Sequence, residues 1–344
     1  MSFPQVSIIL RTKNRNRFLR RALESIDSQV FTNYELLIIN DGGAEEPVAQ
    51  LLAEKSVLSQ KTRLITNPIS RGRDGAWRQG VHEASGTFYA VHDDDDTWDP
   101  EFLQKTTDFL HAHPTHSAVA VRLEVIAEEQ NGDDFTELFR WIYQPHDNYL
   151  SLGNFLRANK TVPIATLYRT EAAREAMPEG NFPVVEDWLL NLSLALKGPF
   201  GFIEGKPLAF WHQRPNDFSV DTGNSITSLS QLHQQLDSQI RDTYLREYVS
   251  EYGLGLVLHL SGLHERLSCK LDRQEREIAD LHRQMQSLSE EIRTLNEYRH
   301  TITNLSQQMQ TLIEDLRTIP RPVHTVVRLS SAVIRKVRRW RHRN

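Results

Sequence analysis

The sequence predicts an α/β domain with a mostly parallel sheet, followed by a C-terminal α-helical coiled coil. Up to about residue 212, short β-branched runs alternate with stretches of helical period, which is typical of parallel strands joined by crossover helices. After about residue 218 the composition changes to glutamine, serine, leucine and charge, and no strand pattern remains. We therefore expect a domain over 1–218, a helical connector over 219–258, a coiled-coil stalk over 259–319 and a basic amphipathic helix over 320–344.

The predicted sheet alternates with helices along the first two hundred residues. Strands are expected over Val6–Leu10, Tyr34–Asn40, Arg63–Asn67, Phe88–His92 and Ala118–Ile126. Helices are expected over Arg17–Ser28, Pro47–Glu54, Gly75–Ala84 and Glu101–His113. Ligands bind such sheets beyond the carboxyl ends of the strands. Thr12, Asn40-Asp41 and an aspartate run all follow strand ends, so we expect them to converge on one place.

The aspartate run, Asp93 to Asp96, directly follows an apolar strand. Four adjacent like charges repel one another unless a cation lies among them. Carboxylate oxygens suit a hard divalent ion that leaves coordination positions for water or substrate phosphates, so the run predicts a Mg²⁺ or Mn²⁺ site. The alternative is an acidic start to the next helix, with Asp99 as N-cap before Pro100. Asp99 alone would meet that need, which favours the metal site.

Composition excludes several other classes of protein. The chain has 344 residues and no apolar run that approaches the roughly 20 residues of a membrane-spanning helix. The N-terminus leads into a strand without a charged and then apolar leader, so we expect a cytoplasmic protein. Cys269 is the only cysteine, which excludes a disulfide framework within the chain and a cysteine-based zinc site.

Apolar residues of the C-terminal third follow a heptad pattern, which predicts a coiled coil and therefore a homo-oligomer. The pattern comprises Leu260, Leu263, Leu267, Leu271, Ile278, Leu281, Met285, Leu288, Ile292 and Leu295, then Ile302, Leu305, Met309, Leu312, Leu316 and Ile319. Between the two sets the register either accepts Arg299 and Ser306 at core positions or slips by three residues. The number of strands is left open, and the alternative is one long helix packed back on the domain.

The segment after Pro320 has a different chemistry from the rest of the chain. It contains eight lysines and arginines and no acidic residue, although the whole chain has a net charge of −5. Apolar residues at mostly helical spacing run from Val323 to Trp340 between these cations. A basic amphipathic helix of this kind is typical of binding to an anionic membrane surface. Nucleic acid is the competing partner, but binding to a phosphate backbone would not require the apolar stripe.

Four motifs occur in the order and at the spacing of a known enzyme family. They are Val6-Ser7-Ile8-Ile9-Leu10-Arg11-Thr12, Tyr34-Glu35-Leu36-Leu37-Ile38-Ile39-Asn40-Asp41-Gly42, the stretch from Ala84 to Asp96, and Glu186-Asp187-Trp188. Over about Val6 to Arg214 the chain resembles the family 2 glycosyltransferases of the GT-A fold. The resemblance implies transfer of a sugar from a nucleoside diphosphate, with inversion at the anomeric carbon and with a divalent metal held by a DXD motif.

The resemblance also assigns roles to the aspartates. Asp93-Asp94-Asp95 occupies the DXD positions, with Asp93 and Asp94 on the donor and Asp95 on the metal. Such a metal would neutralise the diphosphate and stabilise charge on the leaving group. Asp187 matches the catalytic base that takes a proton from the acceptor hydroxyl. The alternative for Asp187 is an acidic first turn that favours the helix dipole.

The remaining assignments concern the nucleotide. Thr12 and the pair Asn40-Asp41 match positions that hold base and ribose, although Asn40 replaces the usual aspartate and leaves the pyrimidine preference as a default. Arg73, with Arg71 and Arg78, either reaches the diphosphate or is a solvated cation on a helix. His212 matches a histidine that serves some members as a further metal ligand, with a structural histidine as the alternative.

We therefore expect a cytoplasmic glycosyltransferase, peripheral at the inner face of the cell membrane. Its acceptor would be a glycan or a lipid-linked sugar in the assembly of a surface polysaccharide such as O-antigen or capsule. Two rivals remain. One is an inactive scaffold that binds nucleotide sugar and organises partners through the coiled coil. The other is a nucleotidyltransferase, but the run Arg11 to Arg17 contains no glycine for a phosphate loop.

Overall fold

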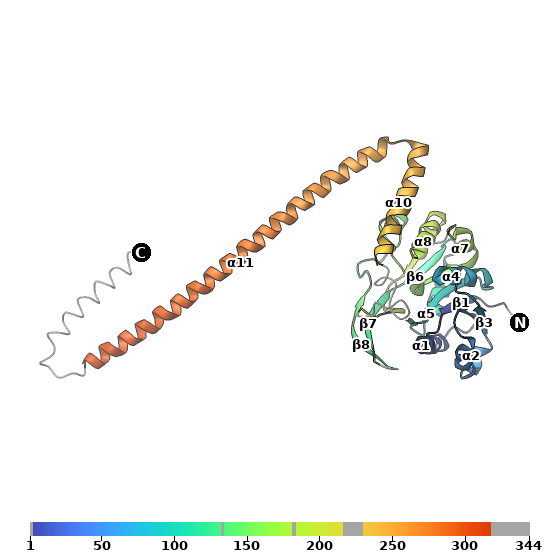
Figure 1. Cartoon of the computed structure of the whole chain (residues 1–344), viewed down its shortest axis with the longest axis horizontal. Coiled ribbons are helices and arrows are strands. Elements are labelled where there is room, and N and C mark those ends of the chain that lie inside the picture. Colours follow the sequence, from blue (N-terminus) through green and yellow to red (C-terminus); the bar gives the residue numbers. More distant parts are fainter. Residues whose placement is uncertain (1–2, 132–133, 181–183, 216–229, 318–344) are drawn as a thin grey trace. The chain divides into compact units, whose positions relative to one another are not determined.

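The computed structural model describes residues 3–131, 134–180, 184–215 and 230–317 (Figure 1). The chain divides into two compact units, with the boundary between Arg246 and Glu247. The first contains both sheets, and the second contains the last residues of one helix and the whole of a longer one. The predicted basic helix over 320–344 lies outside the described residues.

A seven-stranded sheet forms the centre of the first unit. Its strands are β1 (Val6–Thr12), β2 (Tyr34–Asp41), β3 (Thr62–Asn67), β4 (Phe88–Asp93), β6 (Ala118–Val121), β9 (Thr166–Arg169) and β10 (Phe200–Ile203). They lie in the order β10-β6-β9-β4-β1-β2-β3, and β9 alone runs antiparallel to its neighbours. Every residue of β1 is buried, as expected for a central strand covered on both faces. The predicted α/β fold with a mostly parallel sheet is confirmed.

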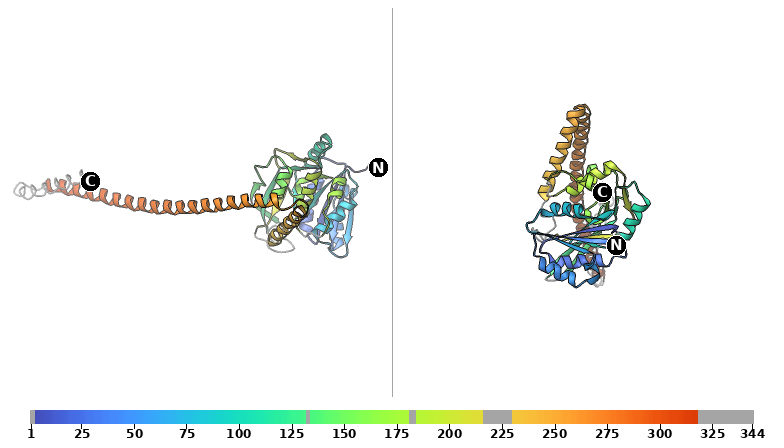
Figure 2. Two further views of the ribbon diagram at one scale, coloured as in Figure 1. Left: turned by 90° about the horizontal axis from the view of Figure 1, so that it is seen from above. Right: turned by 90° about the vertical axis from the view of Figure 1, so that its right-hand side faces the viewer.

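Helices cover both faces of this sheet (Figure 2). In chain order, the helices up to Tyr252 are α1 (Asn16–Asp27), α2 (Glu45–Ala53), α3 (Ser56–Ser59), α4 (Gly72–Glu83), α5 (Phe102–Ala112), α6 (Leu152–Arg157), the 3₁₀ helix η1 (Pro163–Ala165), α7 (Thr170–Ala176), α8 (Glu186–Lys197) and α10 (Ser230–Tyr252), of which α10 packs on α8. One buried cluster joins the sheet to α1, α2 and α5, and a second joins the opposite face to α4, α7 and α8. The four helices expected from the sequence correspond to α1, α2, α4 and α5.

A second, four-stranded sheet has the order β5-β11-β7-β8 and consists of β5 (Thr97–Trp98), β7 (Leu123–Asn131), β8 (Asp134–Ile142) and β11 (Ala209–Gln213). The sequence predicted one strand over Ala118–Ile126, and this was wrong, because the chain changes sheets at Arg122. The Arg122 N–H donates to the carbonyl of Ile203, and its own carbonyl accepts from the N–H of Leu208. Those partners end the pairing of β6 and begin that of β7.

Helix α10 packs on α8 through three apolar residues at intervals of four, Leu232, Leu236 and Ile240. They meet Trp188 and Leu189 of α8 in a small buried cluster. The side chain of Arg241 adds a polar anchor, because Nη1 and Nη2 donate to the carbonyls of Leu156 and Arg157 at the end of α6, at 2.8 and 2.9 Å. This part of the segment expected as a connector is thus attached to the domain.

Helix α11 (Gly255–Arg317) contains 63 residues, and none of them is buried. The heptad residues from Leu260 to Leu312 are all exposed; Leu288, for example, is 57% exposed. None of the described helices combines the length and the apolar composition that crossing a bilayer requires.

Candidate active site

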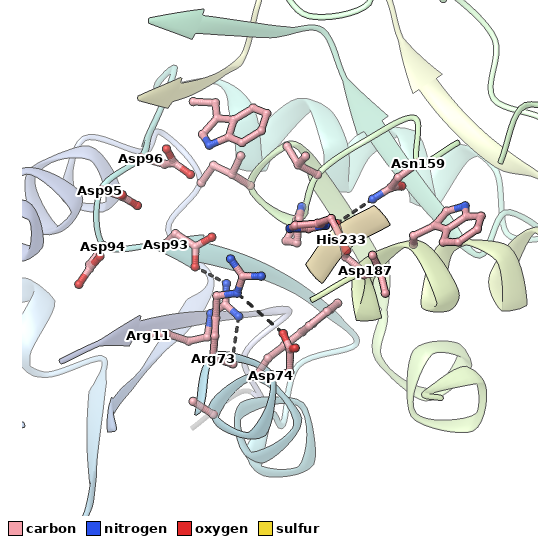
Figure 3. A pocket seen from close by; sticks show the side chains of 18 of the residues that line it. Arg11, Arg73, Asp74, Asp93, Asp94, Asp95, Asp96, Asn159, Asp187 and His233 are labelled. Atoms are coloured by element: carbon pink, nitrogen blue, oxygen red, sulfur yellow. Dashed lines mark hydrogen bonds and ion pairs between the residues drawn. The ribbon is translucent and has the colours of Figure 1, made fainter. Parts of the chain in front are cut away.

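A cavity of about 900 Å³ lies where β1, β2 and β4 end, at the place predicted for the ligand (Figure 3). This volume is near the upper end of the range of about 300–1,000 Å³ found for small-molecule sites. Seven of the nine predicted site residues line it, namely Thr12, Asp41, Arg73, Asp93, Asp94, Asp95 and Asp187. The other two, Asn40 and His212, are buried beside the cavity and are not among its lining residues.

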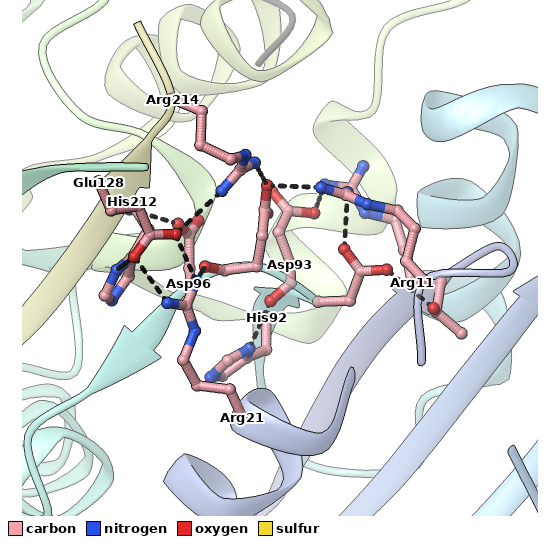
Figure 4. Close-up of polar contacts among 12 residues, drawn as sticks. Arg11, Arg21, His92, Asp93, Asp96, Glu128, His212 and Arg214 are labelled. Carbon is pink, nitrogen blue, oxygen red and sulfur yellow. Dashed lines mark hydrogen bonds and ion pairs between the residues drawn. The ribbon is translucent and has the colours of Figure 1, made fainter. Parts of the chain in front are cut away.

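Arginines surround the aspartate run that ends β4 (Figure 4). Arg11 from β1 pairs with Asp93. Arg15 donates to Asp94 Oδ1 at 2.8 Å and to Asp95 Oδ2 at 2.9 Å, and Arg214, beyond β11, pairs with the same Oδ2. These side chains supply part of the positive charge that four adjacent carboxylates require. The protein itself therefore relieves some of the repulsion among the aspartates, without a metal.

The pKa values of two of these carboxyl groups are shifted in opposite directions. Burial raises the pKa of Asp94 to about 7, although Arg15 opposes the shift. Burial alone would also raise the pKa of Asp95, but Arg15 and Arg214 hold it below its usual range. Asp95 is therefore the permanently ionised carboxylate of the pair.

Asp93 and Asp95 carry carboxylate oxygens of the kind that Mg²⁺ and Mn²⁺ take as ligands. No cluster of three or more His, Cys, Asp or Glu side chains that could hold a metal occurs within the described ranges. Mg²⁺ commonly takes only one or two carboxylates and completes its shell with water and substrate phosphates. Both arginines on Asp95 contact Oδ2, and Arg11 contacts only Oδ1 of Asp93. One oxygen of each carboxylate thus has no protein donor among the described residues.

His212 belongs to a buried network behind the aspartates. Its Nδ1 lies 2.8 Å from Glu128 Oε2, and its Nε2 lies 2.9 Å from Thr97 Oγ1. Glu128 also accepts from Arg21 and Arg214. With both ring nitrogens bonded, His212 holds β11 against β5 and β7, which matches the structural alternative left open by the sequence.

Asp187 lies in the first turn of α8, on the opposite wall of the cavity from the aspartate run. Asn159 donates to its Oδ2 at 2.7 Å, and Asn191 in turn donates to Oδ1 of Asn159 at 3.0 Å. Burial raises the pKa of Asp187, while Arg73 opposes the shift. Val185, two residues earlier, has φ of +67°, which is strained for a β-branched residue. A carboxylate with raised basicity, held in one orientation, has the properties of a general base.

Asp41 shapes the floor of the cavity from the end of β2. Burial alone would raise its pKa, but hydrogen bonds from the N–H of Arg71, the hydroxyl of Ser70 and other donors lower it. These bonds fix the loop that precedes α4 and thereby place Arg73 on the cavity. Asn40 fixes the loop that follows β2, because its Nδ2 donates to the carbonyls of Gly43 and Ala44 at 3.0 and 3.1 Å.

Several lining or supporting residues escaped the sequence analysis: Arg15, Glu128, Asn159, Arg214 and His233. Arg214 lies 119 positions from Asp95, and Asn159 lies 28 from Asp187, so no local periodicity connects them. His233 did have a signal, because His233, Asp237 and Arg241 recur at intervals of four beside the apolar stripe of α10.

Comparison with known proteins gives a consistent result. Residues 7–173 match the family described as Glycosyl transferase family 2. The uncharacterized glycosyltransferase YwdF of Bacillus subtilis (strain 168) is 30% identical over 173 residues, covering 48% of this chain and 58% of that protein. WfgD of Escherichia coli, named as a UDP-Glc:alpha-D-GlcNAc-diphosphoundecaprenol beta-1,3-glucosyltransferase, is 30% identical over 93 residues, covering 27% and 36%.

The chain spans about half the length of the curated relatives it matches first. Among solved structures, residues 1–349 of S. aureus TarS in complex with UDP-GlcNAc superpose with a TM-score of 0.50 at 18% identity, covering 62% of this chain and 60% of that one. This likeness supports the GT-A fold.

Proposed function

Residues 7–173 form a family 2 glycosyltransferase domain, and from that premise we propose that the chain is an inverting, metal-dependent sugar transferase. It would move a sugar from a nucleoside diphosphate to a hydroxyl of a glycan or a lipid-linked acceptor, in the assembly of a surface polysaccharide. The single observation that carries the proposal is that Asp187 and the Asp93-Asp94-Asp95 run line one cavity from opposite walls. Inversion requires this arrangement, because the base must act on the face away from the leaving group.

On the donor side, Asp93 and Asp95 would hold a Mg²⁺ or Mn²⁺ ion, which supplies Lewis-acid stabilisation of the leaving diphosphate. Arg73 and Lys13 also line the cavity and would add positive charge for the phosphates. Arg15 and Arg214 keep Asp95 ionised and hold its position. Preorganised charge of this kind requires no rearrangement during the reaction.

On the acceptor side, Asp187 would accept the proton of the attacking hydroxyl. Asn159 restricts the rotation of its carboxylate by donating to Oδ2, and the backbone N–H groups of Asp187 and Trp188 also bond it. A carboxylate has about four lone-pair sites, so it would still accept the hydroxyl proton. A nucleotidyltransferase would need no such base opposite the donor. This contrast favours sugar transfer over the rival activity.

A lipid-linked acceptor is supported by two further points. WfgD of Escherichia coli is named for a GlcNAc-diphosphoundecaprenol acceptor. The sequence after Pro320 has the composition of a helix that binds anionic membranes. A transferase with such a segment would meet its acceptor at the bilayer surface.

We also propose that α11 pairs with the α11 helix of a second copy. Helices in proteins owe most of their stability to the packing of an apolar face rather than to intrinsic propensity. All heptad positions from Leu260 to Leu312 are exposed in the single chain, at the spacing that a coiled-coil partner requires. The identical stripe of a second copy would cover them.

The test is a panel of UDP-sugars and GDP-sugars with Mn²⁺, each incubated alone and with p-nitrophenyl glycosides or a GlcNAc diphosphate that carries a short alkyl chain. We expect slow hydrolysis of one donor by water and faster transfer when a matching acceptor is added. Binding of nucleotide sugar without hydrolysis or transfer would favour the scaffold. Release of pyrophosphate from a nucleoside triphosphate and a sugar phosphate would favour the nucleotidyltransferase.

A further inference from the structure

Helix α10 supplies a wall of the cavity, although it lies outside the residues that match the family. Four of its side chains line the cavity: His233, Gln234, Asp237 and Arg241. Its apolar stripe faces α8, so these polar residues are turned toward the space beside Asp187. The anchor between Arg241 and the end of α6 fixes this orientation.

His233 is the lining residue of α10 whose hydrogen bonding is incomplete. Figure 3 draws it with Asp187 and Asn159 among the side chains that line the cavity. Its Nε2 is buried and has no hydrogen-bond partner among the described residues. An unpaired buried nitrogen is unusual in a folded protein, because losing its water costs free energy that no partner returns. A ligand in the cavity would supply the partner once the ring turns toward it.

The neutral form of the His233 imidazole is suited to hydrogen bonding with an uncharged ligand group. Burial lowers its pKa, and the charge of Arg73 across the cavity lowers it further, although Asp74 opposes this. The imidazole is therefore mostly neutral at pH 7 and offers one donor and one acceptor. Sugar hydroxyl groups accept and donate in the same way.

Aromatic side chains of the cavity are suited to the apolar face of a sugar ring. Tyr143 and Trp211 line the cavity with their ring centroids 6.0 Å apart, and Trp188 of α8 lines it where α10 packs. Aromatic walls with a few placed polar groups are typical of sites for small organic ligands.

We propose that α10 completes the acceptor subsite and that His233 binds a hydroxyl of the acceptor saccharide, orienting it toward Asp187. This inference rests on the proposed glycosyltransferase function and adds to it a residue that determines acceptor affinity. It also places that residue in a part of the chain that the match to the family does not cover.

The test compares two substitutions of similar size in the full chain, His233→Leu, which makes no hydrogen bond, and His233→Gln, which makes one. The assay uses the panel acceptor that the wild type glycosylates fastest. We expect His233→Leu to lower kcat/KM for the acceptor about tenfold, as one lost hydrogen bond would, and His233→Gln to recover part of the loss. Hydrolysis of the donor by water and the Kd for UDP or GDP should stay within about twofold of wild type.

The control is Gln235→Ala, an exposed position on α10 that does not line the cavity; it should behave as wild type. Equal acceptor kcat/KM for the Leu and Gln variants would overturn the inference, and so would a loss of donor affinity as large as the loss in acceptor kcat/KM. A wild-type chain that neither hydrolyses nor transfers from any donor would instead overturn the proposed function, and the inference with it. A wild-type chain that transfers sugar, with a Leu variant of the same acceptor kcat/KM, would overturn the inference alone.

Discussion

The first unit and helix α11 differ in where their apolar residues are buried. All seven residues of β1 are buried within the chain, whereas none of the 63 residues of α11 is. Both patterns were visible in the sequence as regular apolar spacing. The difference teaches that a spacing predicts an element but not its partner, which can lie in the same chain or in another.

This comparison also separates two tasks. The cavity residues up to Arg241 lie in the first unit, and the heptad residues lie in the second. Substitutions in the first should change turnover and leave the assembly state unchanged. Substitutions in the second should do the reverse, and any variant that changes both would break the separation.

The largest effect on turnover is expected at Asp95, the carboxylate proposed to bind the metal. Asp95→Asn should lower transfer about 10³-fold, which corresponds to several kcal/mol of leaving-group stabilisation, and should abolish the dependence of donor binding on Mn²⁺. Calorimetric titration of UDP with and without Mn²⁺ measures the second effect. The oligomeric state should not change.

A control is needed because Asp95 also pairs with Arg15 and Arg214. Glu128→Gln removes another partner of Arg214 without touching the cavity lining. It should lower the thermal unfolding midpoint but keep the metal dependence of donor binding. An Asp95→Asn variant that transfers sugar at the wild-type rate without added metal would contradict the assignment.

The second-largest effect on turnover is expected at Asp187. Asp187→Asn should lower kcat at least about 10²-fold, as expected for the loss of a general base, while donor affinity stays unchanged. Because burial raises the pKa of Asp187, wild-type activity should fall as the pH drops through a value above the ordinary range for aspartate. Asp187→Asn should lose this acidic limb of the pH profile. A collapse of donor binding with unchanged kcat would place Asp187 in the donor site instead.

The third prediction compares two truncations. A chain that ends at Tyr252 keeps α10 and should be monomeric by light scattering, with donor hydrolysis within about twofold of the full chain. A chain that ends at Asp221 also lacks α10, which exposes the apolar surface of Trp188 and Leu189, so it should unfold at a lower temperature and lose transfer to the acceptor. A monomeric full-length chain would favour the single long helix over the coiled coil.

The elements and site residues that the sequence predicted correctly depend on residues close together in the chain. Strand and helix periodicity predicted β1 to β4 and their helices, because each element buries its own apolar face. The positions of Asp93, Asp95 and Asp187 on the cavity followed from strand ends and from motif resemblance. Each of these features is encoded by residues close together in the chain.

The remaining features depend on contacts between distant residues. The aspartate run suggested that a cation was needed, but the arginines that partly meet this need come from β1, the loop after β1 and the segment after β11. The division of the predicted strand at Arg122 depends on pairing with Ile203 and Leu208. The attachment of α10 to α8 likewise joins segments that a single periodic pattern cannot relate.

The smallest effect on turnover is expected from removing residues 321–344, which lie outside the described residues. This segment carries eight cations and an apolar stripe that ends at Trp340, and each cation near an anionic bilayer contributes roughly 1 kcal/mol that added salt weakens. The shortened chain should therefore float poorly with anionic vesicles, yet transfer sugar to a soluble acceptor at the wild-type rate. Neutral vesicles serve as the control. Equal flotation of the full and shortened chains with anionic vesicles would contradict a membrane anchor in residues 321–344.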